Sequence, residues 1–175
     1  MAVNGKQKGN SFERNVANFL TDLYGEQFLR VPSSGALIGG KNVVRKNTLS
    51  EAQIRNFKGD IIPGDSFPKL NLECKSYADF PFHQLFSGQV KILDTWISQC
   101  VAVEDPGDLS MLIMKFNRKG QFVAVKFSTP GLRVINNFVY ASDQHDVWII
   151  MEHEQFWKLN ADTVKNLCAA DKLDK

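Results

Sequence analysis

The amino-acid sequence predicts an α/β domain with one central mixed β-sheet flanked by helices, and three observations indicate this fold class. Segments of strand character alternate along the chain with segments whose apolar residues recur at helical spacing. Hydrophobic residues make up 43% of the 175 residues, which suffices for a full core. The sequence contains no internal repeat or low-complexity segment. We expect a single domain over residues 1–175, with a core at about 8–135 and a last strand and C-terminal helical extension at about 136–175.

The N-terminal third is predicted to contain one helix, one short strand and a long polar connection. Apolar residues recur at helical spacing over residues 11–24, and Gly25 can end that helix. The stretch "EQFLRVPSSG" predicts a strand at about 27–31 that stops at Pro32. Residues 36–58 are polar and basic, and part of them could form a short helix. A connection of this length in a small domain is usually functional or mobile.

The rest of the chain is predicted to contain most of the sheet. "GDIIPGD" indicates a brief strand and a turn, and "KLNLECKSY" a strand at about 69–77. A helix with a broad apolar face is expected at about 82–103, with Gly88 inside it. "SMLIMKF" and "QFVAVKF" are spaced for a hairpin, "DVWIIM" indicates another strand, and the tail predicts one or two helices.

Composition excludes several classes of protein. No apolar run reaches the roughly 18 residues of a membrane span, and the N-terminus lacks the apolar core of a signal peptide. Three cysteines without paired spacing predict neither a disulfide framework nor a zinc site. A cytoplasmic location is therefore expected, which would be the host cytoplasm for a viral protein. The net charge of +2 is uneven: residues 1–60 carry nine Lys/Arg against five Asp/Glu, so an anionic partner is expected there or the excess is ordinary surface charge.

The stretch "KLNLECKSYADF" places Glu73 and Lys75 on one face of a predicted strand, because alternate strand residues point the same way. The opposite face carries Leu70, Leu72 and Cys74 and is suited to packing against a helix. A buried charge pair is costly unless it is paired or used. One face of this strand is therefore expected to pack, and the other to face solvent or a cleft.

Asp60 precedes Glu73 by 13 positions and would lie beside it if their two strands formed a hairpin. Two neighbouring carboxylates repel each other unless a cation joins them. Oxygen ligands of this kind suit Mg²⁺, or Mn²⁺ as a substitute, and such a metal can activate water against a phosphate. Lys75 is then expected to lie beside the metal site rather than neutralise Glu73, and to act on the phosphate or the nucleophile.

Each of these residues also has a structural interpretation. A Glu-x-Lys pair on a strand is most often an exposed ion pair, and a Gly-Asp pair is often only a turn. Glu13 could form a capping box with Asn10 at the start of the first helix. Asp65 competes with Asp60 as a metal ligand because "PGD" repeats the Gly-Asp pair; Asp60 is preferred because Ile61-Ile62 follows it.

Four segments in order strengthen the functional interpretation: "KGNSFERNVANFL", "LRVPSSGA", "GDIIP" and "LECKS". "GDIIP…LECK" resembles the core motif of PD-(D/E)xK nucleases. The fuller pattern is closest to the archaeal-type and phage Holliday junction resolvases, over about residues 8–77. This resemblance implies a restriction-endonuclease-like core and a metal-dependent DNA endonuclease. Two departures are Gly59, where the family often has proline, and the long 36–58 segment.

The resemblance implies roles for individual residues. Glu13, Asp60 and Glu73 would bind the metal, Lys75 would be the catalytic lysine, and Ser34 would contact the active-site phosphate. Arg14 and Arg30 would be further phosphate contacts. The sequence adds a basic set suited to the DNA backbone: Lys41, Arg45, Lys46, Arg55 and Lys58.

Three functions remain open from the sequence. The first is an endonuclease that resolves four-way or branched DNA, which would act as a homodimer because symmetric cutting requires two active sites. Candidate interface residues are aromatic residues left over by the core, although core packing is the default for each of them: Phe80, Phe82, Phe86, Trp148, Phe156 and Trp157. The second is a restriction-type or nicking endonuclease on linear duplex DNA. The third is a non-catalytic DNA-binding protein of the same fold, which the clustered acids argue against because they repel phosphate.

Overall fold

The computed structural model describes residues 5–32 and 58–169, and it confirms the predicted fold class. A five-stranded sheet in the order β3-β4-β5-β7-β6 forms the centre. The pair β3–β4 is parallel and the other pairs are antiparallel, so the sheet is mixed. Its strands are β3 (Leu70–Tyr77), β4 (Leu109–Phe116), β5 (Gly120–Lys126), β6 (Phe138–Ser142) and β7 (His145–Glu152).

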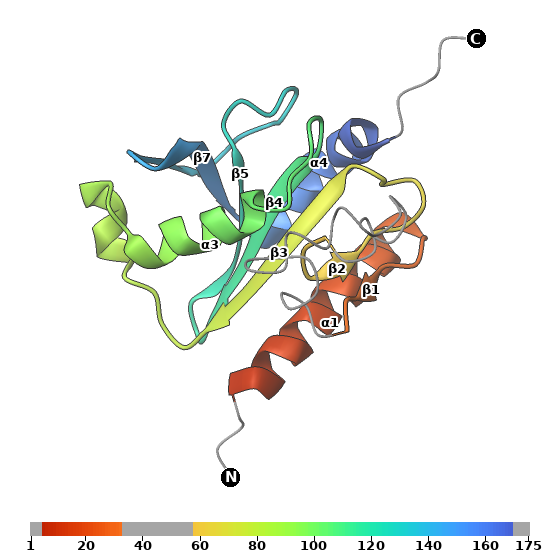
Figure 1. The fold of residues 1–175 in the computed structure, drawn as a ribbon, viewed down its shortest axis with the longest axis horizontal. Coiled ribbons are helices and arrows are strands. Elements are labelled where there is room, and N and C mark those ends of the chain that lie inside the picture. Colours follow the sequence, from red (N-terminus) through yellow and green to blue (C-terminus); the bar gives the residue numbers. More distant parts are fainter. Residues whose placement is uncertain (1–4, 33–57, 170–175) are drawn as a thin grey trace.

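Helices cover both faces of this sheet (Figure 1). On one face, α1 (Gly5–Tyr24) and α4 (His153–Cys168) share a hydrophobic cluster with β3, β4, β5 and β7. On the other face, α3 (Lys91–Val101) and the 3₁₀ helix η2 (Phe82–Ser87) form a second cluster. Figure 1 shows α3 and α4 on opposite sides of the sheet. The C-terminal helix therefore contributes to the same core as the N-terminal one.

The first helix begins earlier than expected. Residues 11–24 were the predicted range, and α1 runs over Gly5–Tyr24. Asn10 consequently lies inside the helix, where it cannot be an N-cap, so the capping-box interpretation of Glu13 is wrong. The predicted end at Gly25 is confirmed, since its N–H donates to the Thr21 carbonyl at 2.9 Å.

The predicted helix at 82–103 is two elements. The 3₁₀ helix η2 ends at Gly88, which has a φ of 71°, and α3 begins at Lys91. A left-handed residue at that point stops the helix instead of continuing it. The hairpin of β4 and β5, the strand β7 and the C-terminal helix are confirmed, whereas β6 was not predicted.

A small second sheet lies beside the free edge of β3. Its strands β1 (Leu29–Arg30) and β2 (Ile61–Ile62) pair antiparallel, with Arg30 opposite Ile61. Next to this pair, the Val31 N–H donates to the Asp60 carbonyl at 2.9 Å. In the described part of the chain, no helix has the length and apolar character that a membrane crossing requires.

Candidate active site

The site is built on β3, which is the edge strand of the main sheet. The predicted alternation is confirmed on its packing face. Leu70, Leu72 and Cys74 belong to the cluster formed with α1. On the other face, Asn71 is fully buried, and its side-chain N–H groups donate to the Cys100 carbonyl and the Ser110 hydroxyl. Glu73, on the same face, is only partly buried.

Asp60 lies against the free backbone edge of β3. Its N–H donates to the Leu72 carbonyl at 2.7 Å, and the Cys74 N–H donates to its Oδ2 at 2.8 Å. The predicted hairpin between the two strands is wrong, because β2 pairs with β1. Asp60 nevertheless reaches Glu73 because these two hydrogen bonds attach it to the residues on either side of Glu73. The competing Asp65 is exposed in a turn.

Gly59 explains how Asp60 comes so close to the strand. Its φ is 60°, and a Cβ added there would lie 2.2 Å from the Leu72 carbonyl oxygen and 2.8 Å from Asn71 Oδ1. Only glycine fits this combination of left-handed backbone and close approach. The φ of proline is fixed near −65°, so a proline could not adopt the backbone that this chain has here. The departure from the resolvase pattern is therefore accounted for by the local backbone.

Glu13 approaches from α1 and is held by Arg30. The Arg30 Nε donates to Glu13 Oε2 at 2.5 Å, and its guanidinium also donates to Asn10 Oδ1 at 2.9 Å. Asn10 sits one helical turn before Glu13, so both side chains lie on the same face of α1. Sequence reasoning assigned Asn10 to a cap and overlooked its place in this network. Arg30, predicted as a phosphate contact, is a positioning residue for Glu13 in the structure.

Glu73 and Lys75 form an ion pair, with Nζ 2.5 Å from Oε1. Lys75 thus neutralises Glu73 here, contrary to the expectation that it would not. Burial raises the pKa of Glu73 to about 7, and the charge of Asp60 adds to this rise while Lys75 opposes it. Burial alone would lower the pKa of Lys75. The charge of Glu73 and its hydrogen bond to Lys75 outweigh burial, with smaller contributions from Asp60 and Tyr77, and the net effect is a raised pKa.

The three carboxylates act on one another electrostatically. Burial raises the pKa of Glu13, followed by the charge of Asp60, while the Arg30 hydrogen bond opposes the rise. Glu13 in turn raises the pKa of Glu73. Mutual repulsion of this kind favours the binding of a cation between the groups, and three carboxylates are the hard oxygen donors that Mg²⁺ takes.

The side chains do not stand in a ready-made coordination geometry. Among residues 5–32 and 58–169, no three His, Cys, Asp or Glu side chains are placed to hold a metal ion together. Each carboxylate has another partner instead: Arg30 for Glu13, the Cys74 N–H for Asp60 and Lys75 for Glu73. The donor chemistry fits a divalent cation: Arg30 contacts Glu13 Oε2 and Lys75 contacts Glu73 Oε1, so the other oxygen of each carboxylate can still bind one.

The structure corrects the assignment of Lys58. Its side chain is 9% exposed, and its Nζ lies 2.6 Å from Asp105 Oδ2 and also pairs with Asp108. A buried ammonium held by two carboxylates has no free charge for DNA, so its role is to attach the chain before Asp60 to the loop before β4. Arg14 is exposed on α1, as a DNA contact requires. Ser34, Lys41, Arg45, Lys46 and Arg55 lie outside the described residues.

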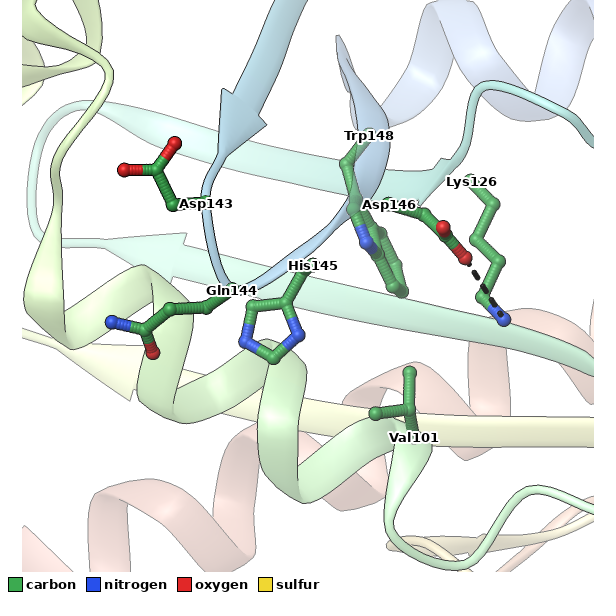
Figure 2. Close-up of a pocket in the computed structure, with 7 residues that line it drawn as sticks. All are labelled: Val101, Lys126, Asp143, Gln144, His145, Asp146 and Trp148. Carbon is green, nitrogen blue, oxygen red and sulfur yellow. Dashed lines mark ion pairs between the residues drawn. The ribbon is translucent and has the colours of Figure 1, made fainter.

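A separate hollow of about 370 Å³ lies between α3 and the β6–β7 turn, and Figure 2 shows its lining. None of the predicted site residues lines it. Two of its side chains have partners elsewhere in the fold: Lys126 contacts Glu104 and Asp146, and His145 Nε2 lies 3.0 Å from the Asp94 carbonyl. These contacts join α3 to β7, which is a structural role.

Comparison with known protein families supports the nuclease interpretation. A family model described as "phage putative PDDEXK endonuclease" matches residues 4–173. The chain belongs to this family. It is accordingly a PD-(D/E)xK nuclease, and the family implies a DNA substrate. No curated protein and no solved structure matches the chain significantly.

Proposed function

We propose that this PD-(D/E)xK nuclease hydrolyses phosphodiester bonds in branched DNA, including four-way junctions, with Mg²⁺ as cofactor and Mn²⁺ as a substitute. The observation that carries the proposal is the convergence of Glu13, Asp60, Glu73 and Lys75 at the free edge of β3. Three elements distant in sequence supply these residues. A binding module has no use for clustered acids beside DNA, so this convergence supports a catalytic site.

Glu13, Asp60 and Glu73 are the residues that would hold the metal. When bound, Mg²⁺ supplies an activated water and neutralises charge on the phosphate under attack. Arg30 positions Glu13 through a 2.5 Å contact, and the backbone N–H of Cys74 orients the Asp60 carboxylate. Once Glu73 is engaged elsewhere, the Lys75 ammonium is free to bind a phosphate oxygen or to orient the nucleophile.

The DNA backbone is proposed to follow the N-terminal third of the chain. Arg14 lies exposed one residue beyond Glu13, and Val31, two residues before the basic segment 33–57, donates its N–H to the Asp60 carbonyl. Its Lys41, Arg45, Lys46 and Arg55 are proposed to contact phosphates, and Ser34 the phosphate at the active site. Such contacts recognise backbone and shape rather than base sequence.

A homodimer is part of this proposal, because paired cuts in a four-way junction require two active sites. Phe86 is the most exposed large hydrophobic residue among those described, at 85%, and it lies near the outer edge strand β6 through its contact with Phe138. Of the other aromatic candidates, Phe82 is partly buried, and four are buried in the core: Phe80, Trp148, Phe156 and Trp157.

The test is a Mg²⁺-dependent cleavage assay on a synthetic four-way junction, a fork and a linear duplex of matched sequence. Preferential cleavage of the junction with paired symmetric cuts supports the proposal. Equal or faster cutting of the linear duplex would instead favour a restriction-type or nicking endonuclease. Binding without cleavage of any of the three, in Mg²⁺ or Mn²⁺, would contradict a catalytic role.

A further inference from the structure

A hollow with aromatic walls lies at the end of the strand that carries Glu73 and Lys75. Its volume is about 410 Å³. It is lined by residues from the loop after β3, from the start of η2 and from the β4–β5 turn, namely Asp79, Phe80, Pro81, Phe82, His83 and Lys119. The Asn117 N–H donates to the Tyr77 carbonyl at 3.2 Å and joins the turn to the end of β3.

The strand β3 connects the hollow to the candidate active site. Glu73, Lys75 and Tyr77 occupy alternate positions and so share one face of the strand. At about 3.3 Å per residue, Tyr77 lies about 7 Å beyond Lys75. Tyr77 is 43% exposed, and its ring packs against Trp96 with 4.8 Å between the ring centroids. A DNA strand whose phosphate is at Lys75 can therefore continue along this face toward the hollow.

The wall of the hollow offers aromatic rings that are held in place. The Phe82 ring packs edge-on against Phe80 and Phe116, at 5.0 and 5.4 Å between ring centroids, and it remains partly exposed. His83 is exposed beside it. Bases stack on rings of this kind without sequence preference, because every base has a flat π-face.

The rim of the hollow carries positive charge. Lys119 Nζ lies 5.6 Å from the centroid of the Phe82 ring, and the exposed Arg118 is the next residue in the turn. Asp79 pairs with Lys119, but the two side chains are 73% and 45% exposed. Ion pairs this exposed contribute little, so Lys119 can exchange Asp79 for a phosphate at small cost.

We propose that this hollow binds an unpaired nucleotide of the strand being cut, with the base against Phe82 and His83 and the phosphate at Lys119 and Arg118. The inference rests on the proposed function and specifies its substrate class. In a continuous duplex the bases are paired and stacked, and bringing one into the hollow costs the energy of unpairing it. Branched DNA with an unpaired nucleotide near the cut avoids that cost and should be cut faster than the same branch with every nucleotide paired.

The experiment measures kcat/KM on forks in which an abasic residue replaces one nucleotide after another in the unpaired arm. The wild-type protein is compared with His83→Ala, Phe82→Leu and Lys119→Gln. Phe127→Ala and Lys158→Gln remove an exposed aromatic and an exposed lysine away from the hollow and serve as matched controls. His83 and Lys119 are exposed, so their variants should fold normally, and thermal unfolding checks Phe82→Leu.

One abasic position is expected to lower wild-type kcat/KM about tenfold, within the range for stacking of one base on an aromatic residue. The same position should have little further effect in His83→Ala and Phe82→Leu, whereas both control variants should behave as the wild type. The inference would be overturned if the abasic residue lowered kcat/KM as strongly in His83→Ala and Phe82→Leu as in the wild type. It would also be overturned if no abasic position lowered kcat/KM of the wild type. Failure to cut any DNA would instead overturn the proposed function.

Discussion

Replacement of Gly59 by alanine tests whether the backbone approach at β3 builds the site. The added Cβ would lie 2.2 Å from the Leu72 carbonyl oxygen at a φ of 60°. Left-handed backbone costs alanine about 1–2 kcal/mol. Moving the chain away from Leu72 also weakens the Asp60 N–H bond, worth about 1 kcal/mol, and the Cys74 N–H bond to the carboxylate, worth about 1.5–3 kcal/mol. The expected loss in the free energy of unfolding is about 3–6 kcal/mol.

The assay is urea unfolding together with Mg²⁺-dependent cleavage. Gly25→Ala is the matched control, because Gly25 has a φ of 67° with no atom within 4 Å of the added Cβ. This control should lose only the strain of about 1–2 kcal/mol and retain its activity. Cleavage by Gly59→Ala should fall about a hundredfold where the protein remains folded, because Asp60 is displaced. The reasoning would be refuted if Gly59→Ala were as stable and as active as Gly25→Ala.

Three further predictions concern residues outside the catalytic chemistry. Lys58→Met should destabilise the protein by about 2–3 kcal/mol in urea unfolding, because it leaves Asp108 without its ammonium partner. The salt dependence of DNA binding should stay unchanged. A flatter salt dependence in this variant would show that Lys58 contacts DNA. Burial lowers the pKa of His153, which accepts a hydrogen bond from the Trp157 indole, so the unfolded chain binds the proton more readily. Stability should therefore fall as the pH drops below about 6.5, and less so in His153→Phe; equal pH profiles would contradict this. Burial raises the pKa of all three cysteine thiols, that of Cys168 to about 12. A thiol reagent at pH 8 should therefore modify no cysteine in the native protein and all three in urea. Rapid labelling of the native protein would contradict the burial of these thiols.

The pattern of the sequence predicts the elements that have strong local signals. The alternation in "LNLECKSY" identifies β3 and its packing face, and the apolar runs identify the hairpin of β4 and β5. Local periodicity does not indicate β6, a short strand at the sheet edge with Val139 49% exposed. An edge strand lacks the continuous apolar pattern of its buried neighbours, so its signal is weak.

The candidate site residues could be predicted individually, but their arrangement could not. The pattern of acids and lysine selects Asp60 and Glu73, whereas the pairing of β2 with β1 depends on contacts distant in sequence. Lys58 is buried because it pairs with Asp105 and Asp108, and Asp108 is 50 residues away in the sequence. Local sequence patterns do not reveal contacts at this separation. Gly59 departs from the resolvase pattern in the sequence, and its close approach to the Leu72 carbonyl and Asn71 Oδ1 gives the physical reason.

Asp60, Glu73 and Lys75 are proposed to form the catalytic centre of a metal-dependent nuclease. The most direct test compares Mg²⁺-dependent cleavage of a branched DNA by the wild type, Asp60→Asn and Lys75→Ala, with DNA binding measured separately in EDTA. Asn can still accept the Cys74 N–H, so the Asp60 variant should fold. We expect both variants to lose cleavage by at least about a hundredfold and to bind DNA nearly as well as the wild type. Unchanged turnover in Lys75→Ala would contradict the assignment.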